Sequence, residues 1–385
     1  MSRTDLNRYR PRWAAAVLVS TVLAVAVGAC AGNDDASGRR SATTTARTTS
    51  FVTAGERLGV GGCPLFPRDH AFHASVAALP VRADSAEVVA ALGGRSLAVR
   101  PAFSASVWQG SRSGIPVNVV DSRLTPPTDV DGGTYAHLSD LSGHPIPASP
   151  RLEGWPGMAW DRHLLIVDSA TCTASEMFFV TPPGLSPTRR WSAETAVRID
   201  LGSNSPRAEG TATASGTSML AGMVRYDEVA RDRLDHAIGV SVPTIRAGAV
   251  RWPATHTDGR SEDPRAPEMG SWLRLRRDVD LSALGPQARV IARALRDHGA
   301  VVVDTNHDGL ALSGEPDERW DDADLAYVAV GEPGRSAQAR AVAGWLIEDL
   351  MSWAAGRRRD HRPTLILFDE FSRVAAYAPA AVDCV

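Results

Sequence analysis

Several ionisable side chains stand beside apolar, strand-like runs, where a sheet would bring them toward one face. They are Asp161, His163, Glu176, Arg225, Glu228, His236 and His256. Carboxylates and imidazoles in one pocket can share the roles of acid and base or nucleophile, as in the hydrolysis or lysis of a polysaccharide. The alternative is structural: Arg225 would pair with a carboxylate, and the histidines would donate to loop backbone. Their spacing matches no known catalytic signature, which favours the structural alternative.

A second pattern, DTNHDGLALSGE at 304–315, has the spacing of a calcium-binding loop. Its candidate ligands are Asp304, Asn306, Asp308, the carbonyl of Leu310, and Glu315. However, the preceding AVVVD predicts a strand and Pro316 follows the loop, so the flanking helices of an EF-hand are not expected. We therefore expect a turn whose side chains cap a helix in DERWDDADL, with calcium as the alternative.

The N-terminus has the features of an export signal. Arginines at 3, 8, 10 and 12 precede an apolar run over 13–29, and Val27-Gly28-Ala29-Cys30 resembles the lipobox of bacterial lipoproteins. The resemblance implies a signal at 1–29 that is removed and a lipid on Cys30 that anchors the protein to the outer face of the membrane. The alternative is an ordinary signal peptide. Residues 30–55 are poor in large apolar side chains and predict a flexible tether.

Export determines how the remaining cysteines are interpreted. Cys63 and Cys172 lie in the body of the chain and can pair outside the cytoplasm. Two buried thiols are the alternative, because sequence spacing does not establish bridge geometry.

Short runs rich in β-branched residues recur over 56–330 and predict a β-dominated α+β domain, built as a β-sandwich or a curled antiparallel sheet. Helices are expected in ADSAEVVAALGG, capped by Asp84 or Ser85, and over 284–298, where apolar residues share one face and Gly299 marks the end. The second is the one main packed helix. The expected strands are IPVNVVD, HLLIVDS, EMFFVTPP, AVRIDLGS, HAIGVSVP, GAVRWPA, WLRLRRDVDL and AVVVDT.

Several stretches of this body resemble a group of secreted bacterial domains over about residues 100–330. They include DRHLLIVDSATCTASEMF, MVRYDEVARDRLDHAIGVSVPTIRAGAVRWPATH, EMGSWLRLRRDVDL and SGEPDERWDDADL. The resemblance implies export and a single fold unit. It implies no particular reaction.

The segment 331–385 predicts a detached helix–strand tail, which we interpret as a fused or remnant segment. RPTLILFDEF resembles the Walker B strand of a conjugative coupling-protein ATPase, with Asp369 and Glu370 at its end. The sequence contains no lysine, so the phosphate-binding lysine of a P-loop is missing, and ATPase activity is not expected.

Composition and motifs narrow the function further. The formal net charge of −3 and the pI of about 6.4 argue against a nucleic-acid partner. The sequence contains neither G-x-S-x-G nor H-E-x-x-H. The leading prediction is a lipoprotein that binds cell-envelope or environmental polysaccharide. If the protein is an enzyme, we expect a hydrolase or lyase that cleaves this polysaccharide. The alternative is a non-catalytic envelope or partner-binding lipoprotein.

Overall fold

The computed structural model describes most of the chain between residues 59 and 325 and one short strand near its C-terminus. The described residues are 59–94, 99–108, 110–158, 160–205, 207, 210–282, 284–306, 309–325 and 382–384. The signal, Cys30, the tether to residue 55 and the Walker B-like strand lie outside these residues, so their assignments stay predictions. None of the helices in the described part of the chain is long and apolar enough to cross a membrane.

The larger sheet has six strands in the order β1-β13-β10-β12-β11-β14. Their bounds are Val99–Pro101 (β1), Leu310–Leu312 (β13), Ile238–Val242 (β10), Ala300–Thr305 (β12), Trp272–Leu275 (β11) and Val382–Cys384 (β14). β1 and β13 pair in parallel, as do β10 and β12, and the other pairs are antiparallel. The sheet is therefore mixed.

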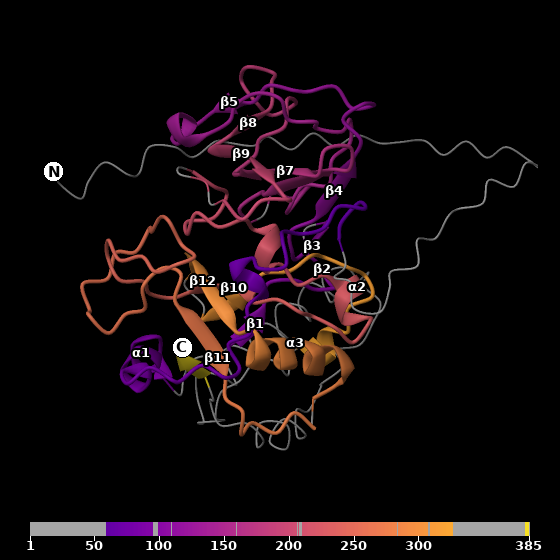
Figure 1. Cartoon of the computed structure of the whole chain (residues 1–385). Coiled ribbons are helices and arrows are strands. Elements are labelled where there is room, and N and C mark those ends of the chain that lie inside the picture. Colours follow the sequence, from indigo (N-terminus) through magenta and orange to yellow (C-terminus); the bar gives the residue numbers. More distant parts are fainter. Residues whose placement is uncertain are drawn as a thin grey trace, which may run out of the picture. The chain divides into compact units, whose positions relative to one another are not determined.

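The second sheet has four strands in the order β4-β6-β7-β9 and lies apart from β10, β11 and β12 in Figure 1. Its strands are Val117–Val120 (β4), Leu164–Asp168 (β6), Thr173–Phe178 (β7) and Thr195–Asp200 (β9), with β4 and β6 parallel. Two small sheets pair Val107–Trp108 (β2) with Ser111–Arg112 (β3), and Asp131–Gly132 (β5) with Ser192–Ala193 (β8).

Alternation along the strands explains how these layers pack. In β12, Val302 belongs to the apolar cluster that includes helix α3 (Pro286–Asp297), whereas Val301 and Val303 join a cluster with Leu165 of the four-stranded sheet. Successive side chains of a strand point to opposite faces, so β12 contributes to both apolar layers. All five residues of β6 are buried, which accounts for the uninterrupted apolar run LLIV.

The remaining helices are short. They are Ser85–Ala91 (α1), Tyr226–Val229 (α2) and Asp322–Leu325 (α4), with 3-10 turns at Ala71–His73 (η1), Ala136–Leu138 (η3) and Leu220–Gly222 (η4). The two helices predicted at 83–94 and 284–298 are present as α1 and α3. Pro286 occupies the first turn of α3, and Gly299 follows it at φ 76°, a backbone conformation that favours glycine.

The β-dominated α+β class is confirmed, but three finer expectations are corrected. Antiparallel pairing holds for only part of each main sheet, because long connections let β4 and β6, and β10 and β12, run in parallel. GAVRWPA forms no strand beyond an isolated bridge at Val250, since its Pro253 has no N–H for a sheet. Finally, β14 pairs with β11, so these residues of the tail are not detached.

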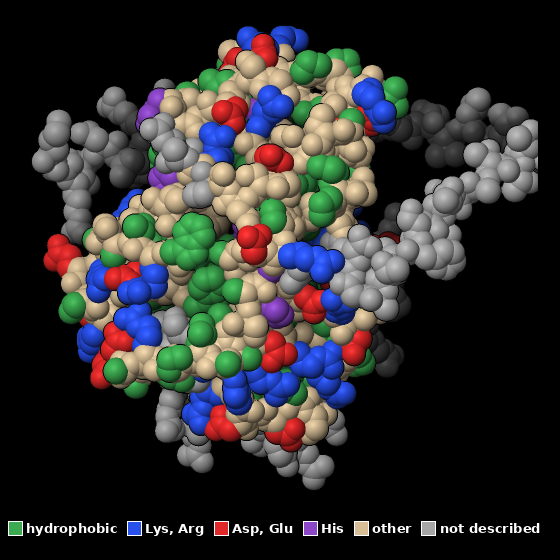
Figure 2. Space-filling view, in the orientation of Figure 1, with side chains coloured by type: hydrophobic (Ala, Val, Ile, Leu, Met, Phe, Trp, Pro, Cys, Tyr) green, Lys and Arg blue, Asp and Glu red, His purple; other side chains and the backbone are tan. Residues whose placement is uncertain are grey.

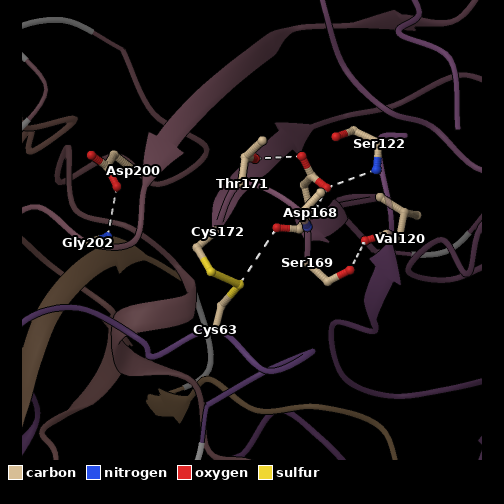
Figure 3. Close-up of a disulfide and its surroundings, with 10 residues drawn as sticks. Cys63, Val120, Ser122, Asp168, Ser169, Thr171, Cys172, Asp200 and Gly202 are labelled. Carbon is tan, nitrogen blue, oxygen red and sulfur yellow. Dashed lines mark hydrogen bonds between the residues drawn. A yellow bond between two sulfur atoms is a disulfide. The ribbon is translucent and has the colours of Figure 1, made fainter. Parts of the chain in front are cut away.

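The predicted disulfide is confirmed and is drawn in Figure 3. Cys63 and Cys172 are bonded, with their Cα atoms 5.3 Å apart across 109 residues of sequence. Beside it, the carboxylate of Asp168 accepts hydrogen bonds from the backbone N–H of Ser122 at 3.0 Å and the hydroxyl of Thr171 at 2.5 Å. Burial opposes the charge on Asp168, but these donors lower its pKa to about 2. The bridge and the carboxylate thus fix the turn between β6 and β7.

Candidate functional site

A groove with a volume of about 620 Å³ lies on the described part of the protein. Three segments that are distant in sequence form it: residues 110–112 at the β2–β3 turn, 150–155 beside Pro116, and 316–319. We call 150–155 the first wall and 316–319 the second wall. Basic, acidic and hydrophobic side chains lie next to one another over much of the face shown in Figure 2.

Buried hydrogen bonds from β4 hold the first wall. The side chain of Asn118 accepts from the backbone N–H of Arg151 at 2.8 Å and donates to the backbone carbonyl of Arg151 at 2.8 Å. Its amide also donates to the carbonyl of Leu165 at 3.0 Å. Asn118 is buried, and its side-chain amide makes the two hydrogen bonds to the backbone of residue 151 that a neighbouring strand would otherwise make.

A buried ion pair fixes the same wall two residues further on. Glu153 accepts a hydrogen bond from the backbone N–H of His163 at 3.0 Å, and its Oε2 lies 2.7 Å from Nδ1 of the same histidine. Both side chains are buried. Burial by itself lowers the pKa of His163, but the charge and hydrogen bond of Glu153, and the charges of Asp161 and Asp304, outweigh it and raise the pKa. His163 therefore positions the first wall.

Ion pairs at the surface hold the second wall. Arg319 donates from Nε and a terminal nitrogen to Asp317, at 2.8 and 2.6 Å, and its guanidinium reaches Asp227 at 3.2 Å. It also lies 4.1 Å from the ring centroid of Tyr226. An ion pair at 3.6 Å links Arg112 of β3 to Glu318.

The helix behind the second wall is anchored by a buried charged cluster. Arg225 donates twice to Glu228, at 3.1 and 2.6 Å, and Nε2 of His236 lies 3.4 Å from the same carboxylate. Burial opposes the charge on Glu228, but His236 and Arg225 lower its pKa. Glu315 accepts from the backbone N–H of Tyr226 at 2.8 Å, which ties α2 to the chain entering the second wall. Arg225, Glu228 and His236 therefore support this wall from behind.

Three tryptophans stand in or beside the groove. Trp155 lines it, and Trp108 and Trp160 pack together with ring centroids 5.7 Å apart. Each is between 38% and 41% exposed. Gly110, which also lines the groove, lies against the ring of Pro156, so the hairpin that carries Trp108 adjoins the segment that carries Trp155. The groove therefore has indole surface both inside it and at its border.

The other predicted site residues lie elsewhere. Glu176 is fully buried on β7 and accepts from the hydroxyl of Ser218 and the backbone N–H of Met219, so it ties η4 to the smaller sheet. Burial raises the pKa of Glu176 despite these donors. His256 bonds to the hydroxyl of Thr255 at 2.7 Å, and Asp161 is exposed just before β6.

In the structure these seven residues are distributed over separate contacts, and their shared pocket stays a prediction. Hydrogen bonds and close ionic contacts join Arg225, Glu228 and His236, and none of the seven residues lines the groove. The physical reason is burial, because a charged side chain in the interior needs a hydrogen-bonding or charged partner. The ion pair expected for Arg225 under the structural alternative is present.

The described members of the 304–315 loop bond partly to one another and partly to other segments. Asp304 accepts from the backbone N–H of Thr305 at 2.8 Å, and Asn306 donates to the carbonyl of Gly309 at 2.9 Å. Leu310 begins β13, and Glu315 faces α2. Burial, helped by the charge of Asp258, raises the pKa of Asp304 to about 6.

Asp308 lies outside the described residues. Elsewhere in the loop the side chains close a turn, but the expected capping of the 317–320 backbone is made instead by Asp317 on the N–H of Arg319. Among the described residues no group of three His, Cys, Asp or Glu side chains is placed to hold a metal ion. Calcium binding stays a prediction.

Several residues that line or support the groove were not among the sequence predictions: Arg112, Arg151, Trp155 and Arg319 line it, and Asn118 supports the first wall. The only available signals were Trp155 and Arg151 in a long Pro/Gly-rich connection, because such connections often carry binding residues. Comparison of the chain with protein-family models, curated proteins and solved structures found no match.

Proposed function

We propose that this protein binds a glycan in the groove between the two walls and does not cleave it. The observation that carries the proposal is the half-exposed indole of Trp155 inside a groove whose walls present guanidinium and carboxylate groups. Flat aromatic faces pack against the apolar faces of sugar rings, while charged side chains hydrogen-bond to hydroxyl groups. A groove with this mixture suits a carbohydrate better than an apolar ligand.

The positions of the carboxylates favour binding over hydrolysis. Asp317 and Glu318 are the acidic side chains among the described lining residues, and both lie on the second wall. Asp317 accepts hydrogen bonds from both the side chain and the backbone of Arg319. Glycoside hydrolysis ordinarily uses two carboxyl groups that flank the bond to be broken. Asp317 and Glu318 are neighbours on one wall and each pairs with an arginine, so they do not supply this arrangement.

We further propose that export and a lipid on Cys30 carry the groove to the outer face of the membrane, with residues 30–55 as the tether. The lipobox-like sequence before Cys30 and the Cys63–Cys172 bridge support this location, since disulfides persist in oxidising compartments. A tether of this length would hold the groove away from the lipid surface and within reach of cell-envelope or environmental polysaccharide.

The test is binding of the full chain, solubilised in mild detergent, to a panel of neutral and acidic oligosaccharides. Measurement by calorimetry should detect at least one ligand, and Trp155→Ala should weaken its binding about 30-fold, as expected for removal of a central aromatic contact. Trp252→Ala is the matched control, because Trp252 is 61% exposed and does not line the groove. Release of reducing ends would show cleavage and contradict the non-catalytic part of the proposal.

The second candidate, a non-catalytic protein-binding lipoprotein, rests on the same exposed tryptophans. Aromatic side chains also dominate protein interfaces. If no oligosaccharide binds, while a proline-rich peptide binds in a Trp155-dependent manner, this candidate replaces the glycan proposal.

A further inference from the structure

We propose that the ligand of the groove is an acidic polysaccharide and that Arg151 pairs with its anionic groups; this rests on the proposed function. The anion is a carboxylate, as in a uronic acid, or a phosphate, as in a polyol-phosphate polymer. Both present oxygen atoms that a guanidinium can bind through two hydrogen bonds.

The pairing of the groove arginines carries the inference. Arg319 is engaged by Asp317 and Asp227, and Arg112 lies 3.6 Å from Glu318. Arg151 differs, because within the described part of the chain its guanidinium forms no ion pair and donates only to the carbonyl of Val117. Its remaining N–H groups are available at the exposed edge of the groove.

The backbone of Arg151 is held in place before any ligand binds. The buried side chain of Asn118 bonds to both its N–H and its carbonyl, each at 2.8 Å. Residue 151 therefore loses little backbone freedom when it pairs with an anion, and less ordering entropy is lost on binding.

Arg151 and Trp155 lie on the same wall and line the same groove. A sugar ring packed on the indole would place a substituent of that ring, or of its neighbour, at the edge where Arg151 stands. Neutral sugars could use Trp155 but would leave Arg151 without a charged partner. The structure therefore predicts preference for an acidic chain over a neutral one of the same size.

The experiment compares three probes with the full chain: oligogalacturonate, a neutral galactan oligomer of equal length, and a glycerol-phosphate oligomer. We expect at least one acidic probe to bind about tenfold or more tightly than the neutral one, with a difference that shrinks as salt rises. Arg151→Gln should abolish the preference, and Arg151→Lys should retain part of it. Which acidic probe binds identifies carboxylate or phosphate as the natural group.

Arg123→Gln is the matched control, because Arg123 is exposed, pairs with Asp121 and lies outside the groove. Arg151→Gln should leave the melting temperature nearly unchanged, which separates lost pairing from unfolding. Equal binding of acidic and neutral probes, lost in Trp155→Ala, would overturn this inference and leave the proposed function standing. Failure of all three probes and of the wider panel would overturn both.

Discussion

Buried contacts hold the first wall of the groove directly, whereas the side chains of the second wall are themselves held by exposed ion pairs and a stacked arginine, with the buried Arg225–Glu228–His236 cluster only behind them. Asn118 and the His163–Glu153 pair connect residues 150–155 to strands β4 and β6 inside the protein. At the second wall, Arg319 and Asp317 form their pair with the arginine side chain 52% exposed. Buried pairs are strongly coupled to folding, while exposed pairs contribute little and are screened by salt. The first wall should therefore keep its conformation when a ligand binds, whereas the side chains of the second wall should be able to rearrange.

The largest effect on stability should come from the Cys63–Cys172 disulfide, which lies at the β6–β7 turn of the four-stranded sheet that supports the first wall. Replacing both Cys63 and Cys172 by Ala releases a chain segment of 109 residues from its constraint in the unfolded state. Loop-closure entropy predicts a loss of about 4–5 kcal/mol in the free energy of unfolding, measured by urea denaturation. A loss below about 1 kcal/mol would show that the bridge adds little to the fold that carries this wall.

The next largest effect should come from Glu153→Ala, which leaves His163 buried without its partner. Breaking a buried ion pair costs about 3 kcal/mol of unfolding free energy. Glu153→Gln should cost less, because its amide oxygen still accepts from the backbone N–H of His163. If Glu153→Ala is as mild as Glu318→Gln on the exposed second wall, the two walls do not differ as described.

A pH dependence should also distinguish the walls. The pKa of His163 is raised in the folded state, so its charged form stabilises the fold fully below the unfolded pKa of about 6.5, and this stabilisation is lost as pH rises through the folded pKa. The stability advantage of the native protein over His163→Gln should therefore be greatest in mild acid and shrink at alkaline pH. Asp161 and Asp304 contribute to this shift together with Glu153. An advantage that grows with pH would contradict the sign.

The smallest effect is expected at the second wall. Arg319→Gln removes the exposed pairs with Asp317 and Asp227, which should cost about 0.5–1 kcal/mol at low salt and less at high salt. The stacking on Tyr226 is lost as well, so Arg319→Lys tests the charge with less of the planar contact. A loss of unfolding free energy above about 3 kcal/mol that salt does not change would show that the second wall is held as firmly as the buried first wall.

Local pattern predicted the elements better than the site. Apolar periodicity and Gly299 located α3, and β-branched runs located β6, β10 and β12, because these signals lie within a few residues of each other. The same reasoning treated His163 as a candidate for chemistry. Its partner is Glu153, which the sequence separates from it by a Pro/Gly-containing turn with no periodicity to predict the contact.

The sequence by itself determined the β-dominated α+β class, the two longer helices and a pair of cysteines suited to a bridge. Only the tertiary structure decided which charges became partners in the interior and which remained at a groove. Residues 110–112, 150–155 and 316–319 meet there although more than 200 residues separate the first segment from the last. Hydrophobic patterning specifies that strands and helices form, whereas the choice of an ion-pair partner depends on distances that exist only after the sheets have packed.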